Sequence, residues 1–381
     1  MRFEKCPHRP GVALWNQRIE RVANRAIRAL DLAAEISHLG GRKANYDDYR
    51  YEFIGGPGET LRRKHYDRSL RLLWKSEEHA PHLGFRDCSD GERELLDMAT
   101  RALTPAEKKA RNRLAKPEFK ALLDREYTTR EKQAIVNILS AIGHGEAYAW
   151  LVSAELLGEV KSTGARAALT MQVMEEAKHF VVLRELLQAF DVPIPRQSAW
   201  EYMFLEGVAK APGLEKFFGM NVAVEGIALS LFGMMSHLPG LEVLRLFHLD
   251  ESRHTGLPMN YFREFPMSAW QRHNPRARLR RFRLILPALA IIPYLEEDLA
   301  ELGIDAFEFG GSVLKKISLL AERAGFFLPV PRAQLLELIN AGFNAYCTAT
   351  RDGHEFRTFT TAETTRGRRE QAVEREIFGV A

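Results

Sequence analysis

Two Glu-x-x-His sequences are the residues of this chain most able to do chemistry. They are Glu176-Ala177-Lys178-His179 and Glu251-Ser252-Arg253-His254. In a helix, residues three apart lie on one face, so the carboxylate and the imidazole of each pair can reach a common point. The first pair interrupts an apolar run, where a buried charge has to be paired, hydrogen-bonded or bound to a metal. The repeated pattern therefore indicates metal coordination.

A further acid precedes each pair. Glu146 comes before Glu176 and Glu225 comes before Glu251, each by about 26 to 30 residues. At about 1.5 Å of rise per residue, such a separation fits one helix, a short turn and an antiparallel helix that returns to the same height. The neighbours of Glu225 are nearly all apolar or small, so an unpaired carboxylate there would be costly. We expect all six groups to converge between helices.

The expected donor set holds four carboxylates and two imidazoles. Hard oxygen ligands combined with imidazole suit iron or manganese better than zinc. The four negative charges also balance two divalent cations. A glutamate on each of two helices, with Glu-x-x-His on each of two others, is the arrangement found in ferritin-like di-iron and di-manganese proteins.

The order of these six residues resembles the ferritin-like di-iron carboxylate superfamily, which includes acyl-carrier-protein desaturases, bacterial multicomponent monooxygenases and arylamine N-oxygenases. The resemblance covers residues 129–265. It implies two metal ions, each held by two glutamates and a histidine. One ion would be bound by Glu146, Glu176 and His179, and the other by Glu225, Glu251 and His254. One or two of the glutamates would bridge the two ions.

The residues next to the second pair extend the resemblance. Asp250 and Arg253 complete an Asp-Glu-x-Arg-His sequence that is common in oxygen-activating members of the superfamily. There, the acid before each ligand accepts a hydrogen bond from the opposite histidine, and the arginine pairs with such acids. The resemblance thus implies that Glu175 holds His254 and that Asp250 holds His179.

The elements that must position these residues are predicted to be helices. Several segments have helical periodicity and almost none alternates with period two, so we expect an all-α protein. The resemblance adds a ferritin-like four-helix bundle at 129–265, with additional N- and C-terminal helices. The expected helices are 12–39, 92–102, 105–115, 129–160, 163–190, 214–237, 240–265, 275–302, 306–324 and 332–351. Around the bundle we expect three further regions: a helical or irregular extension at 1–128 that packs on it, helices of the same domain at 266–356, and a tail at 357–381.

Composition narrows the class of protein. The 381 residues are 46% hydrophobic, and the net charge of +4 comes from bases interleaved with acids, which argues against a nucleic-acid binder. Cys6, Cys88 and Cys347 form no C-x-x-C motif. The first residues do not resemble a signal peptide, and the longest apolar run, 284–295, is short and broken by prolines. We expect a cytoplasmic protein that does not span a membrane.

The expected function follows from the donor set and its surroundings. We predict an O₂-dependent non-haem di-iron oxidase or oxygenase that hydroxylates, desaturates or similarly oxidises a small organic or acyl substrate. Two iron ions are expected, with Fe/Mn and Mn/Mn left open. Because no flavin or iron–sulfur motif is present, an external donor such as a ferredoxin or reductase would supply electrons. An apolar, aromatic or acyl substrate suits the expected lining, Trp150, Phe180, Phe232 and Phe247.

Three alternative functions fit the sequence less well. A ferroxidase or iron-handling protein would need little more than the four helices, and this chain is longer. An N-oxygenase of an amine is disfavoured because that family carries a third histidine where this chain has Phe247. Radical generation for ribonucleotide reduction needs a tyrosine close to the metals, and Tyr148 falls off the face of Glu146.

Other polar residues near the pattern are expected to have smaller roles. His248 is expected to be partly exposed, and His144 is not expected to be a ligand. The basic run at 276–283 would be a solvated helix face, or else a dock for a ferredoxin, an acyl carrier or a coenzyme A phosphate. Assembly as a homodimer is left open.

Overall fold

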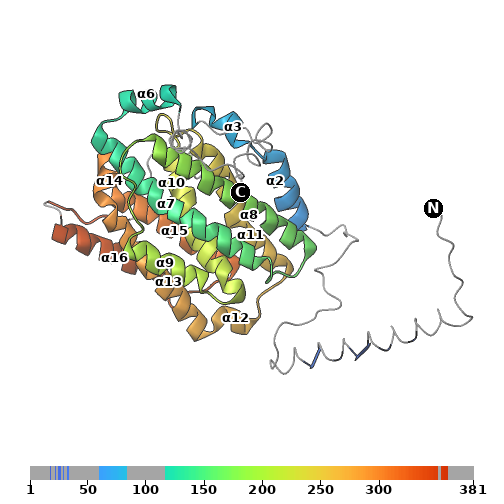
Figure 1. Ribbon diagram of the computed structural model, residues 1–381. Helices are drawn as coiled ribbons and strands as arrows, with labels where there is room; N and C mark the ends of the chain where they lie inside the picture. The colour runs from blue at the N-terminus through green and yellow to red at the C-terminus, as the bar shows by residue number, and fades with distance from the viewer. Residues whose placement is uncertain are drawn as a thin grey trace, which may run out of the picture. The chain divides into compact units, whose positions relative to one another are not determined.

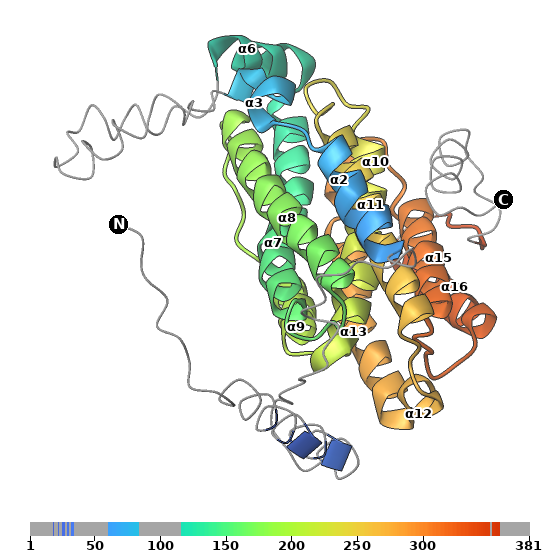
Figure 2. The same cartoon turned by 90° about the vertical axis from the view of Figure 1, so that its right-hand side faces the viewer.

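The computed structural model describes residues 60–83, 116–350 and 353–358, with a few isolated positions between 18 and 33. All regular elements among these residues are helical, which confirms an all-α protein (Figures 1 and 2). The chain divides into two compact units, 1–57 with 161–163, and 58–160 with 164–381. The helices named below belong to the second unit, apart from the first residue of α8. The helices expected at 92–102 and 105–115, most of that at 12–39 and most of the tail at 357–381 lie outside the described residues.

Four long helical segments carry the expected ligands, and each begins and ends within a few residues of its predicted position. They are α7 (Thr129–Leu156), α8 (Thr163–Ala189), η5 with α10 (Phe218–Val224 and Glu225–Met235) and α11 (Leu244–Glu264). A capping box fixes the start of α7, since Thr128 accepts from the backbone of Glu131 and the Glu131 side chain accepts from the backbone of Thr128. In both views these segments run side by side (Figures 1 and 2).

The helix that carries Glu225 is irregular just before that residue. Phe218–Val224 forms a π-helical segment whose seven residues are all buried. Such wide turns occur often at functional sites. The whole helix, Gly213–Met235, has the length and hydropathy of a membrane span, but 89% of its apolar window is buried inside the protein. A core helix has the same properties.

Other helices pack on this group of four or on one another. They are α6 (Pro117–Glu126), α9 (Ala199–Ala209), α12 (Ala269–His273), α13 (Pro275–Tyr294), α14 (Glu296–Glu301), α15 (Ala306–Ala324) and α16 (Arg332–Thr350). α9 packs against α13 and α7, and α15 packs against α10 and α11. The single helix expected at 275–302 was wrong: it ends at Tyr294 and α14 begins at Glu296, close to Pro293, which cannot donate a backbone hydrogen bond.

The described part of the N-terminal extension packs on α11. It contains η2 (Arg62–Tyr66), α2 (Asp67–Leu72), α3 (Ser76–His79) and a short turn, η3 (Pro81–Leu83). The Asn260 amide lies 3.0 Å from His65 Nε2, and Arg253 Nε donates to Ser69 Oγ over 3.1 Å. Periodicity did not predict these short helices, which contact α11 through side chains.

His65 should make the stability of the protein depend on pH. Burial and the nearby positive charges of His254 and Arg253 lower its pKa from 6.5 to about 3. Between these two pKa values the unfolded chain binds a proton that the folded chain does not. The contribution of His65 to the unfolding free energy is therefore fully present above pH 6.5 and is lost as the pH falls. The slope is about 1.4 kcal/mol per pH unit.

Between pH 6 and pH 4, the unfolding free energy of the His65→Gln variant should fall by roughly 2 to 3 kcal/mol less than that of the parent protein. Urea titrations of both proteins, with the same metal content, measure this difference. Identical slopes would show that His65 accepts a proton in the folded protein.

Candidate metal centre

The six expected ligands converge in the interior of the protein. They form two groups whose ligand atoms all lie within 4.8 Å of one another: Glu146, Glu176, His179 and Glu251, and Glu176, Glu225, Glu251 and His254. None of the six side chains is more than 3% exposed. Glu176 and Glu251 belong to both groups, and each has one carboxylate oxygen facing His179 and the other facing His254.

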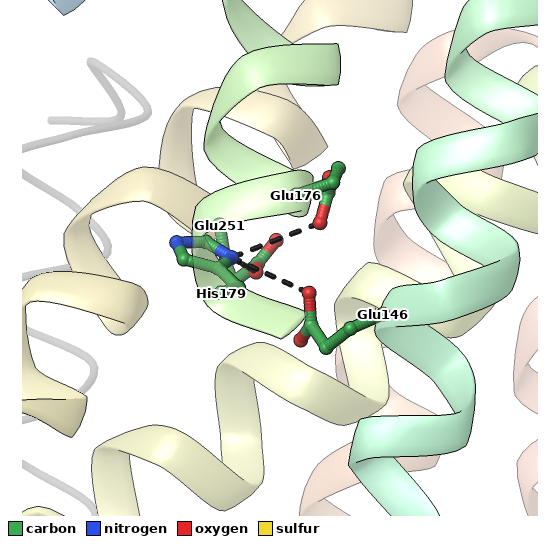
Figure 3. A group of neighbouring side chains, drawn as sticks. All are labelled: Glu146, Glu176, His179 and Glu251. Atoms are coloured by element: carbon green, nitrogen blue, oxygen red, sulfur yellow. Dashed lines mark ion pairs between the residues drawn. The ribbon is translucent and has the colours of Figure 1, made fainter. Parts of the chain in front are cut away.

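The first group surrounds the Nδ1 atom of His179 (Figure 3). This atom lies 3.0 Å from Glu251 Oε1, 3.4 Å from Glu146 Oε2 and 3.7 Å from Glu176 Oε2. All four atoms are buried and none has a hydrogen-bond partner. Buried polar atoms without partners are costly, and here all of them face one point. A cation bound at this point would satisfy the whole set.

The second group surrounds the Nδ1 atom of His254. This atom lies 2.9 Å from Glu176 Oε1, 3.0 Å from Glu251 Oε2 and 3.6 Å from Glu225 Oε1. The two imidazole rings have centroids 6.2 Å apart. The centre thus has two ends, each with one histidine and one unshared glutamate.

Each histidine directs its other nitrogen to an acid on the opposite helix. His254 Nε2 lies 2.8 Å from Glu175 Oε2, and His179 Nε2 lies 3.1 Å from Asp250 Oδ2. The acids can accept the proton on Nε2, so the Nδ1 atom of each ring faces the centre, where a bound metal ion would take its lone pair. The crosswise pairing that the resemblance implies is present in the structure.

Arg253 joins the two acids. Its Nη2 atom lies 2.7 Å from Glu175 Oε1 and 2.5 Å from Asp250 Oδ1. Sequence reasoning did not identify the further donors to Asp250, which are Trp74 Nε1 at 2.9 Å and Lys178 Nζ at 3.1 Å. Burial alone would raise the pKa of Asp250, but His179, Lys178 and Arg253 hold it well below its usual range. Asp250 therefore stays ionised.

The glutamates repel one another. Burial, followed by the charge of Glu251, raises the pKa of Glu146 well above its ordinary value, and burial with Glu176 does the same for Glu225. For Glu176, burial also opposes ionisation, yet His254 and His179 lower its pKa well below the usual range. A divalent cation at each end would remove this repulsion.

Gln172 is a residue of the centre that sequence reasoning missed. Its amide nitrogen lies 3.2 Å from Glu225 Oε1, 3.4 Å from Glu176 Oε1 and 3.0 Å from Ser153 Oγ. Its oxygen accepts from Asn221, which lies in the π-helical segment. Its position in the sequence could have indicated this role, because Gln172 lies one helical turn before Glu176 and therefore on the same face of α8.

Two of the four aromatic residues expected to line a substrate pocket lie beside the centre, although none of the four lines the apolar cavity next to it. Phe247 stacks on His179 with ring centroids 4.1 Å apart, and Phe232 meets both rings edge-on. The other two expectations are corrected. Trp150 lies one turn beyond Glu146 with 42% of its surface exposed, and Phe180, the residue after His179, is only partly buried.

A mainly apolar cavity of about 50 Å³ reaches the centre at Glu146 and Glu225. Its walls come from α7, α9, α10 and α13. Apolar lining residues include Ala149, Phe204, Leu205, Ala228, Leu231 and Ile291. The part of this lining that comes from α9, Glu201, Phe204 and Leu205, was not predicted because α9 was not. The sequence does contain a sign of this helix, since Ser198 and Glu201 form a capping box at the start of α9.

Three polar residues outside the cluster are also placed. His248 was expected to be partly exposed, but it is buried and donates from Nδ1 to the Leu229 carbonyl at 2.9 Å. His144 lies 2.8 Å from Glu201, and the Tyr148 hydroxyl donates to Glu206, so neither is a member of the cluster.

The basic run at 276–283 is not a solvated face throughout. Arg281 is fully buried, pairs with Glu215 at 2.5 Å, and donates to three backbone carbonyls. Arg278 donates to the carbonyls of Leu328 and Pro329. Two of its arginines therefore connect α13 to neighbouring segments.

Comparisons with models of protein families, with curated proteins and with solved structures find no match to this chain. Function is therefore inferred from the geometry of the centre.

Proposed function

We propose that the protein is an O₂-dependent non-haem di-iron oxidase or oxygenase that acts on a small organic or acyl substrate. The observation that carries the proposal is the pair of overlapping ligand groups that share Glu176 and Glu251. Four carboxylates and two imidazoles from four helical segments match the donor set of ferritin-like di-iron centres. This match supports a ferritin-like bundle as the fold of residues 129–265.

The proposed ligands have distinct positions. Glu146 and His179 would hold one iron, Glu225 and His254 the other, and Glu176 and Glu251 would bridge them. Two ferrous ions bound there would supply electrons to dioxygen, which amino-acid side chains cannot do. An external ferredoxin or reductase would restore those electrons.

The chain itself orients the ligands and keeps water out. Glu175 and Asp250 hold the Nε2 protons of the histidines, and Arg253 balances the charge of both acids. Phe232 and Phe247 close one side of the centre with fully buried rings. Exclusion of water strengthens the electrostatic interactions inside and protects reactive species from side reactions.

The cavity favours an organic substrate over the handling of iron. Apart from Glu146, Glu201 and Glu225, its lining is apolar, which suits dioxygen or the end of an apolar group better than a hydrated iron ion. Phe247, at the position where N-oxygenases have a third histidine, stacks on His179. Oxidation at carbon is therefore preferred to oxidation of an amine.

The test of this proposal is metal analysis followed by oxygen consumption. Protein expressed with added iron should contain about two metal ions per chain, as required by the two ligand groups. After reduction it should consume dioxygen and oxidise a member of a panel of acyl, aromatic and amine compounds. Fewer than one metal per chain would disprove the proposal, and metal without substrate oxidation would favour iron handling.

Narrowing the cavity should separate substrate oxidation from metal binding. Ala149→Val adds two carbon atoms to a wall of a cavity of only about 50 Å³. We expect metal content to stay the same and substrate-dependent oxygen consumption to fall about tenfold or more, because one or two methylenes are decisive in a close-fitting apolar pocket. Unchanged oxidation would place the substrate on another side of the centre.

A further inference from the structure

A second, larger cavity of about 810 Å³ lies beside α11, on the side that faces α2 and the end of α15. Six cationic side chains line it: Lys64, Arg68, Arg253, Arg263, Arg272 and Arg323. One carboxylate, Glu322, opposes them. The cations that line this cavity outnumber its carboxylates by five, so positive charge is concentrated here.

Three of these arginines are available to a ligand. Arg68, Arg263 and Arg323 are exposed, and none makes a hydrogen bond or ion pair with a described residue. They come from three different elements, α2, α11 and α15, and reach the same cavity. Arg253 is different, since Ser69, Glu175 and Asp250 already bind its guanidinium.

The inner wall of the cavity is apolar and contains open space. Met259, Phe262, Met267 and Phe327 contribute to it. At Gly256, a Cβ atom would meet nothing within 4 Å, although the residue is buried, so the cavity extends up to the backbone of α11. A ligand there would contact both guanidinium groups and hydrophobic side chains.

From these observations we propose that this cavity binds an organic phosphate, with the phosphate near Arg68, Arg263 and Arg323 and an apolar or aromatic body against the inner wall. Guanidinium groups from three directions suit a tetrahedral anion with several acceptor oxygens better than a single planar carboxylate. The volume is in the range of small-molecule sites, about 300 to 1,000 Å³. The cavity borders the metal centre at Arg253, but binding of a phosphate near Arg68, Arg263 and Arg323 does not depend on the proposed oxidase function.

Calorimetric titration of the purified full-length protein with 1-naphthyl phosphate tests the proposal. We expect saturable binding of about one molecule per chain, at least tenfold tighter than that of methyl phosphate, which has the same headgroup without the aromatic body. Affinity should fall as salt is added, because the contacts of the headgroup are ionic. No saturable binding, or equal affinity for the two phosphates, would overturn the proposal.

Variants locate the site. Arg68→Ser combined with Arg263→Ser should weaken binding at least tenfold, whereas Arg283→Ser removes an exposed arginine outside the cavity and should leave binding unchanged. Gly256→Phe should block the inner wall, and Gly256→Ala, which fits the same space, should not. The paired arginine variant keeps the test valid if Gly256→Phe fails to fold. Binding that is equal in all variants would place the phosphate elsewhere.

Discussion

Glu176→Ala should remove both metal ions, whereas Glu225→Ala should remove only one. Glu176 contributes ligand atoms to both groups, with Oε2 facing His179 and Oε1 facing His254. Glu225 belongs to one group alone. Without a shared carboxylate, each end keeps three ligands and both cations would lose the negative charge between them. Glu251→Ala should therefore resemble Glu176→Ala, and Glu146→Ala should resemble Glu225→Ala.

Metal content per chain, measured after gel filtration of iron-loaded protein, checks this order. Glu185→Ala is the matched control, because Glu185 is a buried glutamate on the same helix as Glu176 and belongs to neither ligand group. It should keep both metals. If Glu176→Ala keeps two ions, or if all four variants lose the same number, the shared role of Glu176 and Glu251 is wrong.

Arg253→Met should strongly destabilise the folded protein. It leaves Glu175 and Asp250 buried without the cation that joins them. Removal of one partner of a buried ion pair costs about 3 to 5 kcal/mol, because the remaining charge stays uncompensated. Arg253→Lys should recover only part of this loss, since an ammonium group cannot reproduce the planar arrangement of donors.

Urea unfolding of the metal-free protein measures the effect. The double variant Arg253→Met with Asp250→Asn should lose less than the sum of its single variants, because the second change removes the charge that the first leaves unpaired. A loss below about 1 kcal/mol for Arg253→Met would mean that water or a rearranged Lys178 replaces the arginine.

The parts of the site that lie within one helix could be predicted from the sequence. A spacing of three residues fixes the relative positions of Glu176 and His179, and of Glu251 and His254, because helical geometry is local. Helical geometry also predicts that the adjacent residues Glu175 and Glu176 point in different directions. Adjacent residues lie about 100° apart on a helix, so one of the two faces His254 Nε2 and the other faces the centre.

Contacts between distant segments could not be predicted in the same way. Trp74 reaches Asp250 from a short segment of the N-terminal extension whose sequence has no clear period. Trp150 has the spacing of a lining residue, but the structure leaves it exposed. Which neighbour covers a helix face depends on tertiary packing, and a single sequence does not encode that in any local pattern.

The π-helical segment Phe218–Val224 also sets the angular phase of the helix that contains Glu225. Phe217, just before the segment, packs against Tyr261 and Phe262, and Phe218, its first residue, packs against Phe326. After it, Glu225 faces the metal centre. A regular α-helix turns about 100° per residue, so deletion of one residue from the segment would rotate these two parts relative to each other. Either Phe217 and Phe218 or the Glu225 carboxylate could then keep their present contacts, but not both.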